Sequence, residues 1–150
     1  MPRTNKSIGA GLALAAASLT LTGCESVVEQ VAKTYHATLT GAEEVPGPGD
    51  PDGSGRAEVS ISDRLDQVCY EIAGVTGIAP ATMAHIHRGA KGVAGPVVVT
   101  LEPPTDGHSK ACTKASESIA DEIKATPSGF YVNVHNAEFP NGAIRGQLAD

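Results

Sequence analysis

Short stretches of alternating apolar and polar side chains dominate the chain after residue 33. Residues 56–62 alternate in this way, and residues 67–73 do so again. Because successive side chains of a strand point to opposite faces, this period of two predicts two strands, each with one buried and one hydrated face. The turn between them favours a β-hairpin. The expected buried positions are Ala57, Val59, Ile61, Val68, Tyr70 and Ile72.

Five further short stretches are rich in β-branched and aromatic residues and are bounded by Gly, Pro or Asn. This composition and these turn signals predict strands at 34–40, 82–87, 96–101, 130–135 and 143–148. Residues 43–55 contain three Pro and four Gly, so we expect a loop there.

Only residues 116–125 favour a helix, with Ile119 and Ile123 four positions apart on one helical face. Ser118 and Asp121 have the spacing of a capping box, with Asp in place of the usual Glu. The Thr-Pro step that follows should end the helix. About seven short strands and one helix predict an all-β fold, an antiparallel Greek-key-like β-sandwich or barrel with one short crossover helix.

Charge and composition exclude several functions. The net charge is −6 and aromatic residues make up only 3% of the chain, whereas nucleic-acid binding needs a basic surface and often stacking rings. We therefore expect no nucleic-acid partner. Nucleophilic catalysis has no support either, because no Ser lies in a Gly-x-Ser-x-Gly motif.

The first 24 residues have the features of an export signal. Arg3 and Lys6 precede an uncharged apolar run at 8–21, which is too short for a membrane-spanning helix of about 20 residues. The run ends in Leu-Thr-Gly-Cys24, which resembles the bacterial lipobox. This resemblance implies cleavage before Cys24 and lipidation of its thiol, and Glu25 in the next position favours the outer membrane. An ordinary secretory signal with an incidental Cys is the alternative.

These features predict a lipoprotein signal peptide at 1–23, a lipid-anchored tether at 24–33 and one β domain at 34–150. The acyl chains at Cys24 would hold the protein to the cell envelope, facing the periplasm or the cell surface. Cys69 and Cys112 then remain as an even pair in an oxidising compartment, which is most simply a disulfide. Two free buried thiols are the alternative.

Three histidines are candidate metal ligands. His85 and His87 project from the same face of a strand, about 6.6–7 Å apart. His135 shares the polar face of its strand with Tyr131 and Asn133. If the two strands are neighbours, the three imidazoles can meet, and imidazole is a common ligand of copper and zinc. In the alternative, the rings bond to backbone carbonyls and hold the Gly-rich turn at 89–95.

Three segments, in order, resemble the chordin-type (CHRD) domain family. They are LTGAEEVP at 39–46, HIHRGAKG at 85–92 with GPVVV at 95–99, and FYVNVHN at 130–136 with FPNGAIRGQL at 139–148. The resemblance covers about 34–148 and implies an all-β, Greek-key-like domain. In animals this domain occurs as repeats in a secreted protein that sequesters growth factors.

A fainter resemblance, to copper/zinc superoxide dismutase, rests on a His-x-His strand, a later His and a late Arg. Here these are His85, His87, His135 and Arg145. The zinc ligands of that enzyme have no clear counterpart, and we expect Arg145 to pair with a carboxylate.

We therefore expect a non-catalytic envelope lipoprotein that binds a partner, a ligand, or a copper or zinc ion through His85, His87 and His135. A superoxide-dismutase-like copper enzyme and a purely structural envelope module are the alternatives.

Overall fold

The computed structural model describes residues 32–62 and 67–150, which form eight strands and one α-helix. The strands are β1 (Lys33–Thr40), β2 (Ser54–Ser62), β3 (Gln67–Thr76), β4 (Ala81–Arg88), β5 (Val97–Leu101), β6 (Ser109–Lys114), β7 (Phe130–Asn136) and β8 (Ile144–Gln147). The α-helix is α1 (Glu117–Ala125). Two single-turn 3-10 helices lie at Gly41–Glu43 and Pro127–Gly129.

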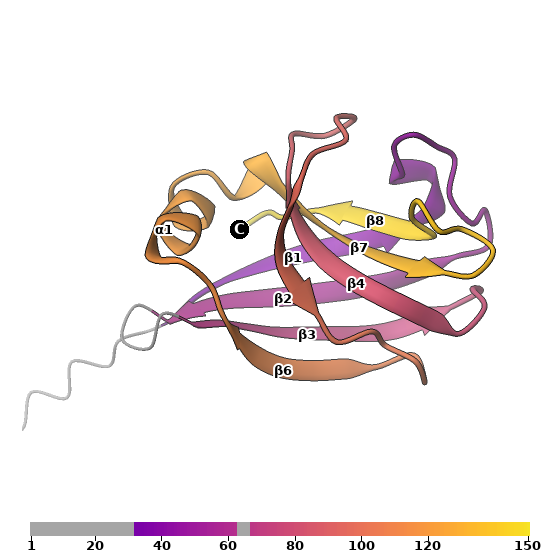
Figure 1. Ribbon diagram of the computed structural model, residues 1–150, viewed down its shortest axis with the longest axis horizontal. Helices are drawn as coiled ribbons and strands as arrows, with labels where there is room; N and C mark the ends of the chain where they lie inside the picture. The colour runs from indigo at the N-terminus through magenta and orange to yellow at the C-terminus, as the bar shows by residue number, and fades with distance from the viewer. Residues whose placement is uncertain (1–31, 63–66) are drawn as a thin grey trace, which may run out of the picture. The chain divides into compact units, whose positions relative to one another are not determined.

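All strands belong to one antiparallel sheet with the order β5-β4-β7-β8-β1-β2-β3-β6. The sheet curls so that its two edge strands, β5 and β6, approach each other (Figure 1). This nearly closed arrangement leaves little exposed strand edge. The prediction of an all-β sandwich or barrel is confirmed, and α1 connects β6 on one edge to β7 near the other.

The inner face of the curled sheet holds the hydrophobic core. The predicted hairpin exists as β2 and β3, paired in antiparallel register with Val59 opposite Tyr70. All six expected apolar positions of this hairpin are buried. Burying one such side chain contributes roughly 1.5–3 kcal/mol, so the alternating pattern determines which face of each strand points inward.

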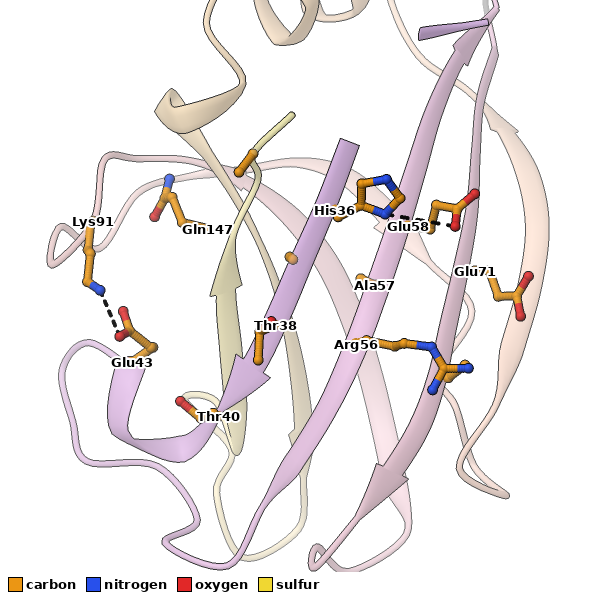
Figure 2. Close-up of a pocket in the computed structure, with 13 residues that line it drawn as sticks. His36, Thr38, Thr40, Glu43, Arg56, Ala57, Glu58, Glu71, Lys91 and Gln147 are labelled. Carbon is orange, nitrogen blue, oxygen red and sulfur yellow. Dashed lines mark ion pairs between the residues drawn. The ribbon is translucent and has the colours of Figure 1, made fainter. Parts of the chain in front are cut away.

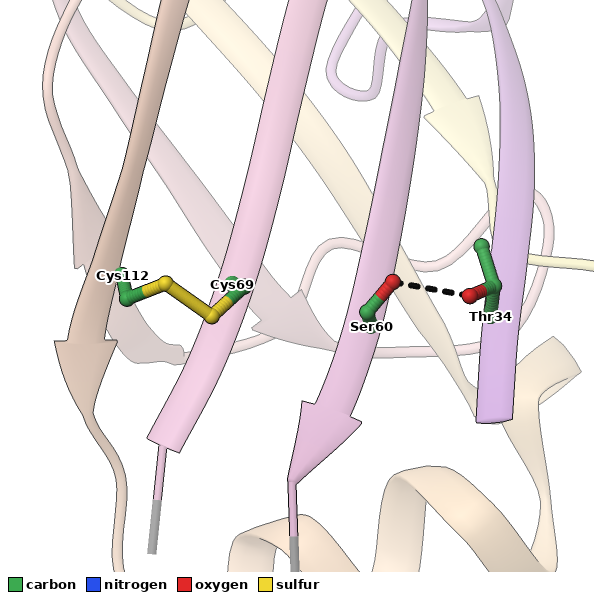
Figure 3. The surroundings of a disulfide bond; sticks show 4 residues. All are labelled: Thr34, Ser60, Cys69 and Cys112. Carbon is green, nitrogen blue, oxygen red and sulfur yellow. Dashed lines mark hydrogen bonds between the residues drawn. A yellow bond between two sulfur atoms is a disulfide. The ribbon is translucent and has the colours of Figure 1, made fainter. Parts of the chain in front are cut away.

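The sequence prediction missed β6, a polar edge strand with no regular apolar alternation. It pairs with β3, and Cys112 lies directly opposite Cys69. The two cysteines form the expected disulfide (Figure 3). On the next two strands the same row continues with Ser60 and Thr34, whose hydroxyl oxygens lie 2.8 Å apart. The disulfide lies on the outer face of the sheet and links the edge strand β6 covalently to β3.

The predicted helix begins one residue later than expected and ends where expected, at Ala125. Its N-cap is Ser116, whose hydroxyl oxygen accepts a hydrogen bond from the Ile119 amide at 3.3 Å. The capping box proposed for Ser118 and Asp121 was therefore wrong, because Ser118 already lies within the first helical turn.

The predicted signal peptide, Cys24 and nearly all of the tether lie outside the described residues. The strand β1 begins at Lys33. In the two described ranges, the helix is too short and too polar to cross a membrane.

Candidate functional site

The pairing of β4 with β7 brings three histidines together. In this register Met83 lies opposite His135, His85 opposite Asn133, and His87 opposite Tyr131. Because the residues alternate along both strands, all six side chains project from the outer face of the sheet. The two strands are thus neighbours, which is the condition under which the sequence predicted that the imidazoles would meet.

The three imidazoles form a compact cluster, named here the histidine cluster (His85, His87 and His135). The Nδ1 atom of His85 lies 3.1 Å from Nε2 of His135. One nitrogen from each ring lies within 4.8 Å of the others. His85 is half-buried, and the ring centroids of His85 and His135 are 5.0 Å apart.

Backbone carbonyls determine which ring nitrogens carry protons. The Nδ1 atom of His87 lies 2.8 Å from the carbonyl oxygen of Gly95, and Nδ1 of His135 lies 3.1 Å from that of Pro140. Since a carbonyl can only accept, both Nδ1 atoms donate, which leaves a lone pair on Nε2 of His87 in the neutral ring. Nε2 of His135 faces both Nδ1 of His85 and Oδ1 of Asn133, each at 3.1 Å. Nε2 of His87 is buried and has no hydrogen-bond partner among the described residues.

Burial keeps the cluster uncharged near neutral pH. It lowers the pKa of His87 and of His135 below the ordinary histidine value. Burial, together with the neighbouring His135 and His87, lowers the pKa of His85 to about 4. A neutral imidazole is the form that binds a metal ion, so protons compete little for these nitrogens at pH 7.

The turn after β4 is held against the cluster by stacked side chains. The ring of Tyr131 stacks on His87, with centroids 4.8 Å apart, and the guanidinium carbon of Arg145 lies 3.4 Å from the centroid of the same ring. The Tyr131 hydroxyl accepts a hydrogen bond from the Gly95 amide at 3.2 Å. A side chain at Gly95 would collide with the Arg88 carbonyl, so only glycine fits at this close approach.

The sequence predicted that Arg145 pairs with a carboxylate, but its hydrogen bonds go to backbone carbonyls instead. Its side chain is buried, with an exposed fraction of 1%, and its Nη2 donates to the carbonyl oxygens of Ala90 and Val93 at 3.0 and 3.1 Å. The neighbouring Gln147 donates to the carbonyl of Gly89 at 2.8 Å. The loop of residues 89–95 is therefore anchored by β8, and Arg145 acts as a structural clamp.

A buried carboxyl group lies near this clamp. Glu44 has an exposed fraction of 5%, and one of its carboxyl oxygens has no hydrogen-bond partner among the described residues. Burial raises its pKa to about 7, although the charge of Arg145 acts in the opposite direction. The sequence placed Glu44 at the start of a Pro- and Gly-rich loop, where no local pattern indicates burial.

A separate groove crosses the outer face of β1, β2 and β3 and has a volume of about 700 Å³. Figure 2 shows Lys91 paired with Glu43 and, apart from them, His36 paired with Glu58. The ammonium of Lys91 lies 2.8 Å from the Glu43 carboxylate. None of the three clustered histidines lines this groove.

The other two histidines of the domain lie apart from the cluster. His36 on β1 and His108 before β6 have side-chain exposed fractions of 62% and 54%. His36 lies 3.9 Å from Glu58, and His108 lies 3.4 Å from Glu71. Both therefore serve as natural controls for the cluster.

A family model for the CHRD domain matches residues 35–148, which is most of the chain. The chain belongs to the CHRD domain family. The resemblance drawn from the three sequence segments is thereby confirmed. The matched region of this CHRD domain contains the histidine cluster, Arg145 and the disulfide. Neither the curated proteins nor the solved structures include a match to the chain.

Proposed function

We propose that this protein is a cell-envelope lipoprotein whose CHRD domain is a non-catalytic binding module for one copper or zinc ion, held by His85, His87 and His135. The observation that carries the metal proposal is the convergence of three imidazole nitrogens within 4.8 Å of one another.

The spacing of these nitrogens is close to that of a ligand set. Two nitrogens bound at about 2.0–2.1 Å in tetrahedral geometry lie about 3.4 Å apart. The His85 and His135 nitrogens are already 3.1 Å apart, and the third imidazole needs only a small movement to join them. An ion entering here would take the place of the hydrogen bond between these two rings, and each neutral imidazole would bind it through its unprotonated nitrogen while its proton stays on the other ring nitrogen.

The surroundings of the rings support the same proposal. Metal-bound histidines commonly donate their second ring N–H to a carbonyl, which fixes the ring orientation. His87 and His135 already make this bond, to Gly95 and Pro140. Three imidazoles suit copper and zinc better than magnesium or calcium, which prefer oxygen ligands.

The lipoprotein part of the proposal rests on the N-terminal sequence. A charged start, an uncharged run at 8–21 and Cys24 follow in the order that lipidation requires. The Cys69–Cys112 disulfide is consistent with an oxidising compartment. We infer an outer-membrane anchor at Cys24, with the CHRD domain free to meet an ion or another extracytoplasmic partner.

Metal competition tests the binding proposal. The full chain carrying Cys24→Ser is titrated with Zn(II) and Cu(II) against chelators of known affinity, followed by elemental analysis. We expect one ion per chain. His87→Ala should weaken binding at least 100-fold, and His36→Ala should not change it. Binding that survives in His87→Ala, or no binding in the parent chain, would overturn the proposal.

Two further measurements address location and activity. Fractionation of cells that express the unmodified chain should place it in the outer membrane, and Cys24→Ser should release it; the same distribution for both chains would refute the anchor. A superoxide assay of the copper-loaded protein should detect no dismutation. Turnover that disappears in His85→Ala would instead support the superoxide-dismutase-like enzyme.

A further inference from the structure

Met83 is a sulfur-bearing side chain beside the histidine cluster. It lies two residues before His85 on the same face of β4 and directly opposite His135 on β7. Side chains in directly opposite positions have Cβ atoms about 4.5–5.5 Å apart. The thioether of Met83 therefore starts from a position adjacent to one of the three imidazoles.

A change of register in the backbone before Met83 determines how its side chain faces β7. A β-bulge interrupts the register between Ala81 and Met83, and bulges redirect the side chains that follow them. The Thr82 hydroxyl donates to the carbonyl oxygen of His135 at 3.4 Å, which ties the two strands together at this point. From Met83 to Arg88 the pairing with β7 is regular.

The Met83 side chain is also accessible and is not packed in the core. Its exposed fraction is 44%, which makes it one of the three large apolar side chains exposed in the described residues. An unbranched side chain with three rotatable bonds can turn its sulfur toward the neighbouring imidazoles without repacking the core.

From this juxtaposition we propose that Met83 is a fourth, thioether ligand of the site and that the site therefore selects Cu(I). The inference rests on the proposed metal function and narrows it. Imidazoles alone accept zinc and copper, whereas a thioether is a soft ligand that favours Cu(I). Zinc and Cu(II) bind through the imidazoles and gain little from the sulfur.

The test compares the parent chain with Met83→Leu, which conserves volume and apolar character but removes the sulfur. Both carry Cys24→Ser, so that the remaining cysteines are in the disulfide. Cu(I) affinity is measured without oxygen and without thiols, by competition with a Cu(I) chelator, and Zn(II) affinity is measured in parallel. Val97→Ala is the matched control, because it changes another exposed apolar side chain, which lies on β5 directly opposite His87.

We expect Met83→Leu to weaken Cu(I) binding at least tenfold and to change Zn(II) binding less than twofold, with Val97→Ala equal to the parent. Equal Cu(I) affinity in Met83→Leu and the parent, with metal still bound, would overturn the inference alone. If the parent chain binds neither Cu(I) nor Zn(II), the proposed function is overturned as well.

Selenium labelling supplies a direct readout. The chain contains two methionines, Met1 and Met83, so selenomethionine marks few positions. X-ray absorption at the copper edge should detect selenium next to Cu(I) in the labelled parent and not in labelled Met83→Leu. A copper environment without selenium in the labelled parent would show that Met83 is not a ligand.

Discussion

Nδ1 of His85 on β4 lies 3.1 Å from Nε2 of His135 on β7, although the two residues are 50 positions apart in the chain. Nδ1 of His135 donates to the carbonyl of Pro140, and Nε2 of the same ring faces both His85 and Oδ1 of Asn133. Each ring thus holds the other in the orientation that a shared ion would need.

This contact predicts that a bound ion stabilises the fold. An ion present at 100 times its dissociation constant raises the free energy of unfolding by about 2.7 kcal/mol when it binds only the folded state. We expect zinc to produce a rise of this size in the parent chain, and a chelator to reverse it. Urea unfolding with and without zinc measures the effect.

His135→Ala should lose this stabilisation, and His36→Ala should retain it, because His36 lies outside the cluster. A zinc effect of equal size in His135→Ala would place the ion elsewhere on the protein.

Arg145→Met should destabilise the fold by about 2–4 kcal/mol, because two hydrogen bonds from a charged donor to the carbonyls of Ala90 and Val93 are lost. Hydrogen exchange in the loop of residues 89–95 should also become faster. Arg56→Met, at an exposed position on β2, is the control and should change stability by no more than about 0.5 kcal/mol. Unchanged loop protection in Arg145→Met would contradict the clamp role.

Replacing Cys69 and Cys112 with Ala should lower the free energy of unfolding by about 2–4 kcal/mol, since the disulfide closes a long loop in the unfolded chain. Metal affinity should not change, because the disulfide joins β3 to β6 while the histidines lie on β4 and β7. Denaturant unfolding and zinc competition measure the two effects. Ser60→Ala, in the same row of the sheet, is the control. A parallel loss of metal affinity would show that the two regions are coupled.

The buried carboxyl group of Glu44 should make the stability of the fold depend on pH. Its pKa is raised to about 7 in the folded state, so its contribution to stability is fully present below the ordinary carboxyl pKa and is lost as pH rises through about 7. Arg145, whose charge opposes this shift, is the cation that acts on the carboxyl group. Glu44→Gln keeps the shape of the side chain and removes its titration.

We therefore expect Glu44→Gln to gain stability relative to the parent between pH 5 and pH 8, by on the order of 1 kcal/mol. Denaturant unfolding at a series of pH values measures the difference. A constant difference between Glu44→Gln and the parent across this range would mean that Glu44 is ionised throughout.

Several features of the fold and site could be predicted from the sequence because they depend on neighbouring residues. The alternation in 56–62 and 67–73 was sufficient to assign the buried face of the β2–β3 hairpin. The same period of two placed His85 and His87 on one face, and His135 with Asn133 and Tyr131 on another. The disulfide followed from the two cysteines that remain when Cys24 is assigned to the predicted lipobox, without knowledge of the strand that carries Cys112.

The remaining features depend on residues far apart in the chain. The strand β6 has a polar sequence and is held as a strand by β3 and the disulfide, so no local pattern reveals it. Arg145 and Glu44 are charged residues for which no local pattern indicates burial, yet both are buried by segments that pack over them.

By itself the sequence determined every described strand except β6, the inward faces of β2 and β3, the cysteine pair and the polar face that the clustered histidines occupy, because local periodicity and composition encode these. Only the tertiary structure decided that β4 pairs with β7 and in which register, and hence that Met83, His85 and His87 meet His135. The choice of a distant partner strand depends on how the whole sheet buries its inner face, and no single segment contains that information.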